Sequence, residues 1–340
     1  MSFIDDILKY KSVSIAGLEK NTGKTETLNY IINNLKDRNK TVALTSIGVD
    51  GESIDSVTNT HKPDITVYEN MLFVTSEKHY RERRVTSEIV DVSDISTSLG
   101  RLVVARAKDT GKIKLSGPAD TGSLKNIINH LSTFGAEITI VDGALSRLSL
   151  ASPTVTDALV LATGAALSAN ISELVRKTKY VYDLTQLPAV SKSLKDVLSP
   201  ISSGIKALKS LSSKSEDVID LGIDSVFSLN GSQNIFKHGK IIYIPGAVSD
   251  KVLSMFKTQK NIDKSIIIIN DFTKVFAKAE TFYSFIKQQG KIMVLNKPNL
   301  IAITINPLSP AGYMLNSKDL KHELTKQIDV AIHNIKQTNI

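Results

Sequence analysis

Short apolar runs alternate along the chain with stretches in which apolar residues recur every three or four positions. The run at residues 13–16 is typical of a buried β-strand. The segment after it has the spacing of one helical face, with apolar residues at Leu28, Ile31, Ile32 and Leu35. Residues 41–52 form a second apolar run that ends in a glycine-punctuated turn. This order predicts a strand–helix–strand unit.

The same alternation continues further along the first half. A helix is predicted over residues 123–132, and buried strands are predicted over residues 137–144 and within residues 152–168. Residues 77–84 carry a run of charges that is typical of a solvated helix face. Residues 102–115 read as two β-runs around Asp-Thr-Gly, which predicts a hairpin at a sheet edge. The expected class is α/β, with a mostly parallel sheet flanked by helices.

The second half begins with a segment rich in serine and lysine and then alternates again. Strands are predicted within residues 225–230, 240–246, 265–270 and 291–296, separated by helices. We therefore expect a nucleotide-binding domain at residues 1–188, a linker or helical segment at residues 189–218, and a second, smaller α/β domain at residues 219–340.

Composition narrows the function classes. The chain has 340 residues, of which 41% are hydrophobic, and no secretory leader or membrane-length apolar run is recognised, so we expect a cytoplasmic protein. The absence of cysteine excludes thiolate metal sites, disulfides and thiol catalysis by this chain. The six histidines are scattered without metal-ligand spacing. The net charge is +8, but the lysines are spread along the chain and no aromatic–basic motif appears, which argues against nucleic-acid binding.

Residues 17–25 read Gly-Leu-Glu-Lys-Asn-Thr-Gly-Lys-Thr and lie between a predicted strand and a predicted helix. In that context backbone N–H groups and the positive helix end face a triphosphate. Lys24 is predicted to neutralise the β- and γ-phosphates, and Thr25 is predicted to ligate Mg²⁺. The residues expected to bind the nucleotide are Gly17, Lys20, Asn21, Thr22, Gly23, Lys24 and Thr25. The sequence therefore predicts a P-loop NTPase that binds ATP or GTP.

Carboxylates after two predicted strands are candidates for the metal site and the catalytic site. Asp142 ends the apolar run at residues 137–144 and is predicted to hold Mg²⁺ opposite Thr25, as a Walker B residue does. Asp50 and Glu52 follow the second strand, where a side chain can meet Mg²⁺ or the attacking water. We expect Asp50 to position that water, although a solvated turn explains these two carboxylates equally well.

The loop also has an unusual length. Gly17 stands six residues before Gly23, one more than the common P-loop pattern, so that Leu18 occupies the place of the usual first glycine. This length resembles dethiobiotin synthetase, and Lys-Asn-Thr-Gly-Lys-Thr resembles the molybdopterin-guanine dinucleotide biosynthesis adaptor proteins. Related ATPases that dimerise over nucleotide carry a lysine where this chain has Glu19, with Lys20 one place later. This difference argues against a nucleotide-sandwich dimer.

Five segments together resemble the P-loop subunit of the lysine 5,6-aminomutase reactivase. They are residues 17–25, 45–52, 141–147, 157–165 and 303–312. The resemblance implies ATP-dependent rescue of an adenosylcobalamin-dependent aminomutase of lysine fermentation. It also implies two protein partners, which are that aminomutase and a second ATPase subunit similar to mismatch-repair MutS proteins.

Two other function classes remain open at this point. The first is an ATP-dependent ligase that phosphorylates a small carboxylate or carbamate, as the resemblance to dethiobiotin synthetase implies. Residues 45–48 read Thr-Ser-Ile-Gly, where a second-substrate lysine motif would be expected, and this disfavours the ligase. The second is a nucleotide-dependent adaptor that binds without hydrolysis.

Overall fold

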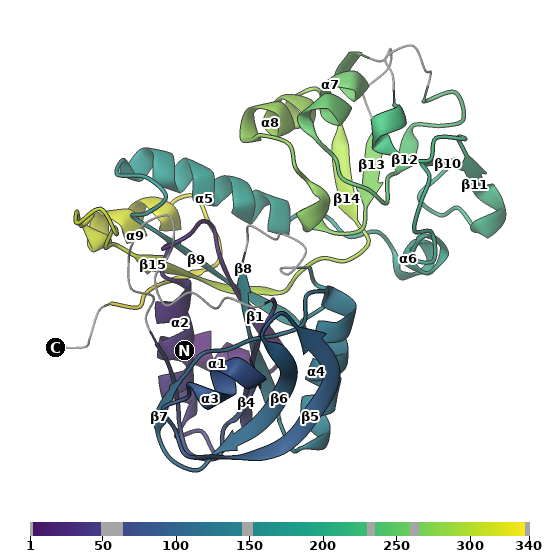
Figure 1. Ribbon diagram of the computed structural model, residues 1–340. Coiled ribbons are helices and arrows are strands. Elements are labelled where there is room, and N and C mark those ends of the chain that lie inside the picture. The colour runs from purple at the N-terminus through teal and green to yellow at the C-terminus, as the bar shows by residue number, and fades with distance from the viewer. Residues whose placement is uncertain (1–2, 49–63, 145–151, 230–234, 259–264, 337–340) are drawn as a thin grey trace. The chain divides into compact units, whose positions relative to one another are not determined.

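The polypeptide forms two units, one of them made from two separate stretches of the chain. The computed structural model describes residues 3–48, 64–144, 152–229, 235–258 and 265–336. Unit 1 comprises Met1–Lys179 together with Asn299–Ile340, and unit 2 comprises Tyr180–Pro298 (Figure 1).

Unit 1 is built on a large mostly parallel sheet, which confirms the predicted α/β class. Among the described residues this sheet has nine strands. In spatial order they are β16 (Ala331–Asn334), β15 (Leu300–Asn306), β9 (Ala158–Gly164), β1 (Ser12–Gly17), β8 (Ile138–Ala144), β2 (Val42–Ser46), β4 (Leu72–Ser76), β6 (Gly100–Ala107) and β5 (Ser87–Thr97). The strands from β16 to β4 are parallel, whereas β6 and β5 continue the sheet in antiparallel pairing.

Helices cover both faces of this sheet (Figure 1), and its strands β1, β2, β4 and β9 are accordingly buried along their whole length. The helices of unit 1 are α1 (Phe3–Ile7), α2 (Lys24–Leu35), α3 (Glu77–Arg81), α4 (Thr121–Thr133), α9 (Ser317–Thr325) and the first part of α5 (Ile171–Thr185). Alternate residues of one strand face opposite sides of the sheet: Leu44 of β2 packs in the cluster that holds α1 and α2, whereas Ala43 packs in the cluster that holds α4. The helical face predicted for α2 is fully buried.

The predicted hairpin over residues 102–115 is wrong in its pairing. Its first run, β6, pairs with β4 and β5, whereas its second run, β7 (Gly111–Ile113), pairs antiparallel with β3 (Ile65–Val67) in a separate two-stranded sheet. A local β-pattern identifies both strands, but it does not identify their partners. In this region the long β5–β6 pair, which local reasoning missed, takes the place of the predicted one.

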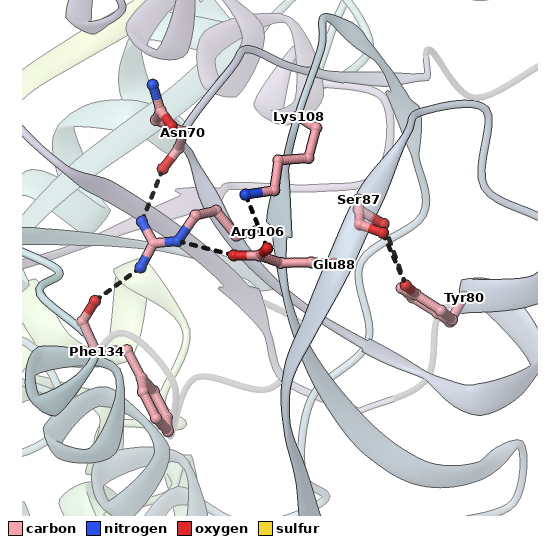
Figure 2. A network of polar contacts seen from close by, with 7 residues as sticks. All are labelled: Asn70, Tyr80, Ser87, Glu88, Arg106, Lys108 and Phe134. Atoms are coloured by element: carbon pink, nitrogen blue, oxygen red, sulfur yellow. Dashed lines mark hydrogen bonds and ion pairs between the residues drawn. The ribbon is translucent and has the colours of Figure 1, made fainter.

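The β5–β6 pair is held to its surroundings by Arg106, which reaches three neighbours (Figure 2). Its guanidinium donates to the carbonyl oxygens of Phe134 at 2.9 Å and Asn70 at 3.3 Å. Its Nε lies 3.9 Å from Glu88, which is its cross-strand partner and also pairs with Lys108 at 2.8 Å. Asn70 lies in a turn and Phe134 ends α4, so Arg106 ties the β5–β6 pair to two neighbouring segments. Its contact with Glu88 also pairs opposite charges across the two strands.

His79 is buried at the start of the helical turn α3. Its Nδ1 shares a hydrogen bond of 2.8 Å with the Ser116 hydroxyl, and only 2% of the residue is exposed. Burial lowers the pKa of the imidazole, and the nearby Lys114 ammonium lowers it further. Folding therefore favours the neutral form of His79 relative to the unfolded chain.

This burial predicts a loss of stability in acid. The pKa of His79 is lower in the folded state than in the unfolded state, so the unfolded state binds more protons as the pH falls below about 6.5. The free energy of unfolding therefore decreases as the pH drops through that range. His79→Gln is expected to reduce the slope of unfolding free energy against pH between about pH 7 and pH 5. Urea titrations at several pH values measure this slope. His322→Gln, on exposed α9, is the matched control, and an equal effect of the two substitutions would contradict the assignment.

The described residues of unit 2 form a smaller sheet of five strands. Its strands, in spatial order, are β11 (Val218–Asp220), β10 (Lys206–Leu208), β12 (Ile241–Tyr243), β13 (Ile266–Ile269) and β14 (Lys291–Val294). The last three are parallel. Its helices are α6 (Lys192–Leu198), α7 (Asp250–Thr258), α8 (Ala279–Lys287), the end of α5 and the short 3-10 helices η2 (Ser215–Asp217), η3 (Val226–Ser228) and η4 (Phe272–Lys274). The strand predicted within residues 225–230 is wrong: the Ser225 hydroxyl accepts a hydrogen bond from the Phe227 N–H and turns the chain into η3.

The structure divides the chain differently from the predicted domain ranges 1–188, 189–218 and 219–340. The first boundary falls inside α5, and residues 299–340 return to unit 1. There β15 pairs in parallel with β9, from Leu300 beside Leu159 to Asn306 beside Gly164. The apolar run at β15 predicts a strand, but it does not determine which of the two sheets the strand joins. Unit 2 is therefore an insertion within unit 1.

Candidate functional site

The glycine-rich loop lies at the carboxyl end of β1, where the order of the strands reverses. The chain leaves β1 through α2 toward β2 on one side of the sheet, and it later returns to β9 on the other side. In open α/β sheets ligands bind outside the carboxyl ends of the strands at this kind of switch point. The position of the loop in the fold therefore agrees with a ligand site.

Two residues of the loop have left-handed backbone conformations. Asn21 has φ of 61°, which asparagine tolerates better than most residues, and Gly23 has φ of 94°. The loop is tied to its surroundings by the Leu18 N–H, which donates to the carbonyl oxygen of Ala162 at 2.9 Å. Within the loop the buried Thr22 hydroxyl donates to the carbonyl oxygen of Glu19 at 2.8 Å. The loop thus holds its shape through its own hydrogen bonds.

The two glycines of the loop are required by close contacts. A Cβ on Gly17 would lie 2.7 Å from the Thr22 hydroxyl oxygen, and a Cβ on Gly23 would lie 2.6 Å from the Cβ of Asn306. Gly23 also has the positive φ that a side chain rarely adopts. These contacts leave no room for a side chain on the inner surface of the loop.

The loop leads directly into the positive end of α2, a helix of 12 residues. Gly23 is its N-cap residue and supplies no side-chain hydrogen bond to the first turn. The N–H groups of that turn have no partner within the helix, and together with the helix dipole they favour an anion. This arrangement is chemically suited to phosphate oxygens.

Lys24 and Asp142 meet at the carboxyl edge of the sheet. The Lys24 ammonium lies 3.0 Å from Asp142 Oδ1, and their side chains are 20% and 11% exposed. Asp142 is in register with Ile15 of the neighbouring strand β1, which places its carboxylate beside the loop. Two residues that are 118 positions apart in sequence, and that were predicted to act together, are therefore in contact.

The carboxylate of Asp142 is incompletely satisfied. Its Oδ1 is buried, and apart from the ion pair with Lys24 it accepts no hydrogen bond of ordinary geometry from the described residues. Nearly all buried polar atoms in proteins have such partners, and exceptions are common where an ion or ligand binds. A carboxylate oxygen and the hydroxyl of Thr25, in the first turn of α2, are also the ligand types that Mg²⁺ prefers. The residues present therefore fit a magnesium ion that is held together with a phosphate.

The other predicted site residues have different outcomes. Lys20 is an exposed residue of the loop, and Thr25 is half-buried. Asp50, predicted to position water, and the neighbouring Glu52 lie outside the described residues. Of the predicted site residues, Lys24 and Asp142 are thus the pair that the structure brings into direct contact.

Residues from the far end of the chain also support the loop, and sequence reasoning placed them in another domain. Asn306, the last residue of β15, contacts Gly23, and the Thr304 hydroxyl shares a hydrogen bond of 2.7 Å with the Thr27 hydroxyl of α2. Thr27 in turn donates to the carbonyl oxygen of Gly23 at 3.0 Å. The available signal was the polar ending of an apolar run at Asn306, which marks the carboxyl end of a strand.

The loop after β15 is ordered by several hydrogen bonds close to this site. The carbonyl oxygen of Asn306 accepts from the Ala165 N–H at 2.9 Å, and the Tyr313 hydroxyl donates to the carbonyl oxygen of Ala165 at 2.6 Å. Ser309 N–H donates to the carbonyl oxygen of Tyr313 at 2.9 Å. The loops that follow β9 and β15 are therefore joined to each other beside Gly23.

Comparison with family models, with curated proteins and with solved structures found no match for this chain. Across the part of the chain that the structure describes, no helix is both long enough and apolar enough to cross a membrane. The same part contains no group of three or more histidine or acidic side chains that could hold a metal ion by themselves. A magnesium ion bound with a nucleotide needs only one or two protein ligands, because phosphates and water supply the others.

Proposed function

We propose that this chain is a P-loop NTPase that binds ATP or GTP with Mg²⁺. The observation that supports it best is the contact of Lys24 with the incompletely satisfied Asp142, beside a glycine-constrained loop and an uncapped helix start. The Lys24–Asp142 ion pair places an ammonium group and a carboxylate beside the loop, where the ammonium can bind phosphate and the carboxylate can bind a metal ion.

Each residue has a distinct role in this proposal. The backbone of residues 21–25 cradles phosphate oxygens, and the Lys24 ammonium exchanges its contact with Asp142 for the β- and γ-phosphates. Thr25 and Asp142 would hold Mg²⁺. When bound, Mg²⁺ neutralises the charge that develops on the phosphates. Asp50 would orient the attacking water, as the sequence predicts.

We further propose that nucleotide turnover serves the reactivation of an adenosylcobalamin-dependent lysine aminomutase, together with a MutS-like ATPase subunit. This finer proposal rests on the resemblance of the five segments named above. Binding and hydrolysis would bias a two-state element, so that the aminomutase releases damaged cofactor and accepts intact cofactor. In this proposal the radical chemistry belongs to the aminomutase, and this chain supplies nucleotide binding and turnover.

The test is nucleotide hydrolysis by the purified protein, with ATP and with GTP, in the presence and absence of the aminomutase and the MutS-like subunit. Acceleration by these proteins, together with restored activity of an inactivated aminomutase, is the expected result. Turnover that depends on a small carboxylate substrate instead would indicate a ligase. Tight binding without turnover under every condition would indicate an adaptor.

Asp142→Asn is expected to act on the metal dependence of turnover. Removing the negative charge should raise the Mg²⁺ concentration for half-maximal hydrolysis by about 10- to 100-fold, with a smaller effect on nucleotide binding in the absence of Mg²⁺. Magnesium titrations of the initial rate measure this change. Glu137→Gln, an exposed carboxylate just before the amino end of the same strand, is the control. An unchanged Mg²⁺ dependence in Asp142→Asn would remove Asp142 from the metal site.

A further inference from the structure

Ser46, the last residue of β2, contacts Asp142 on the neighbouring strand β8. Its hydroxyl donates to the carbonyl oxygen of Asp142 at 3.1 Å, and only 4% of the residue is exposed. Ser46 belongs to residues 45–48, which read Thr-Ser-Ile-Gly where a ligase would be expected to carry a second-substrate lysine. The structure thus gives this stretch a contact with a residue of the proposed metal site.

The strand register directs the Ser46 and Asp142 side chains to the same face of the sheet. Ser46 of β2 and Ile15 of β1 are the partners of Asp142 on the two strands that flank it. Residues paired in this way on parallel strands, which lie about 4.8 Å apart, direct their side chains to one face. Ile15 and Leu44 pack in the cluster that holds α2, and Leu44 is two residues before Ser46. The shared face is therefore the one covered by the helix that begins at Lys24.

The loop that precedes α4 restrains the end of β2. The Gly48 N–H donates to the carbonyl oxygen of Pro118 at 2.7 Å, and the Gly117 N–H donates to the carbonyl oxygen of Gly48 at 3.0 Å. Gly117 also lies against the main chain of Ser46, so closely that a Cβ at position 117 would collide with the Ser46 carbonyl group. These contacts hold the backbone from which the Ser46 hydroxyl reaches Asp142.

The contact from Ser46 differs in kind from the contact that Lys24 makes with Asp142. Lys24 pairs with the carboxylate, whereas Ser46 bonds to the main chain of the same residue. In the proposed function Lys24 exchanges Asp142 for phosphate, and the Ser46 hydrogen bond can persist because it leaves the carboxylate free. Metal ligands are commonly oriented by such outer partners, whose loss weakens metal binding by about 10- to 100-fold.

We propose that Ser46 is a positioning residue of the metal site. It holds the main chain of Asp142, so that the carboxylate keeps its orientation toward Mg²⁺ after Lys24 has turned to the phosphates. The inference rests on the proposed function, which assigns Asp142 to the metal. Gly117 belongs to the same arrangement, because a side chain at that position would displace Ser46.

The experiment uses Mn²⁺ in place of Mg²⁺, because electron paramagnetic resonance detects bound Mn²⁺ without any turnover. Dissociation constants of ATP and of GTP are measured for the full chain with and without Mn²⁺, and their ratio gives the contribution of the metal. Ser46→Ala should reduce this contribution by about tenfold and alter the spectrum of bound Mn²⁺, while metal-free nucleotide affinity changes by less than about twofold. Thermal melts show that the variants are folded.

Thr45→Val is the matched control. Thr45 precedes Ser46 in β2 and is also buried, but its side chain points to the opposite face of the sheet. Its substitution should leave the contribution of Mn²⁺ unchanged. A double-mutant cycle of Ser46→Ala with Asp142→Asn should show effects that are not additive, since Ser46 acts through Asp142.

The outcomes separate this inference from the proposed function. An equal contribution of Mn²⁺ in the wild type and Ser46→Ala, with a loss in Asp142→Asn, would overturn the role of Ser46 and leave the proposed function intact. An equal loss in Thr45→Val would overturn it too, because the cause would be a general loosening of β2. Additive effects in the cycle would show that Ser46 does not act through Asp142. Nucleotide binding that Mn²⁺ does not strengthen in the wild type would overturn the metal site and this role together.

Discussion

Replacing Lys24 by alanine is expected to weaken ATP or GTP binding by about 100-fold or more and to abolish measurable turnover. A charge-assisted contact to phosphate contributes roughly 2–4 kcal/mol where water is largely excluded, and a tenfold change corresponds to about 1.4 kcal/mol. Lys24 is the cation that the structure brings closest to Asp142 among the described residues, at 3.0 Å. Its removal takes away the phosphate partner and leaves Asp142 without its ion pair.

Titration with a fluorescent nucleotide analogue measures the affinity of the Lys24→Ala variant directly. A thermal melt provides a second readout, because a ligand at 100 times its dissociation constant stabilises a folded protein by about 2.7 kcal/mol. The variant should lose that stabilisation. Lys11→Ala, just before the amino end of β1, is the control at the opposite end of the same strand. Equal affinity in wild type and Lys24→Ala would exclude this loop as the nucleotide site.

Replacing Gly23 by alanine is expected to remove nucleotide binding and to lower the free energy of unfolding by about 1–3 kcal/mol or more. Part of this cost is the positive φ of 94°, at which a side chain is strained. The rest is steric, since the new Cβ would lie 2.6 Å from the Cβ of Asn306. Relief of that contact moves the loop, and with it the N–H groups that would face the phosphates.

Gly135→Ala separates the cost of the positive φ from the cost of the steric contact. Gly135 has nearly the same φ, 91°, but nothing lies within 4 Å of the position of its Cβ. Urea denaturation should therefore show a smaller loss of stability for Gly135→Ala than for Gly23→Ala. Adding Asn306→Gly to the Gly23→Ala variant should recover part of the steric cost, which a double-mutant cycle measures. No coupling between positions 23 and 306 would show that the contact does not constrain the loop.

Much of the candidate site could be predicted from the sequence, because its parts have local signatures. Lys24 follows a strand and opens a helix, and Asp142 ends an apolar run. Since carboxyl ends of parallel strands share one edge of a sheet, their proximity was a reasonable expectation. The 3.0 Å contact between Lys24 and Asp142 Oδ1, and the burial of that oxygen without a further partner among the described residues, were not predictable, because they depend on the register between β1 and β8.

The larger errors concern which elements are partners. The run that becomes β15 has the same pattern as the runs of unit 2, so its return to β9 could not be read from local periodicity. For this reason Asn306 was assigned to a different domain from the Gly23 that it touches. The β5–β6 pair was not predicted for a similar reason: the alternation of side chains along a strand does not identify the strand that lies beside it.

The insertion of unit 2 has a consequence for how the protein is synthesised. Strand β15 emerges from the ribosome only after residues 180–298, so the wall formed by Asn306 beside Gly23 is absent from every nascent chain that has not yet reached residue 306. The inserted unit pairs its own beginning with its own end, since the Val294 N–H donates to the carbonyl oxygen of Pro188 at 2.9 Å. Once it folds, it shortens the loop that separates β9 from β15. If the proposed function is right, a nascent chain would gain the complete nucleotide site only after residue 306 has been synthesised.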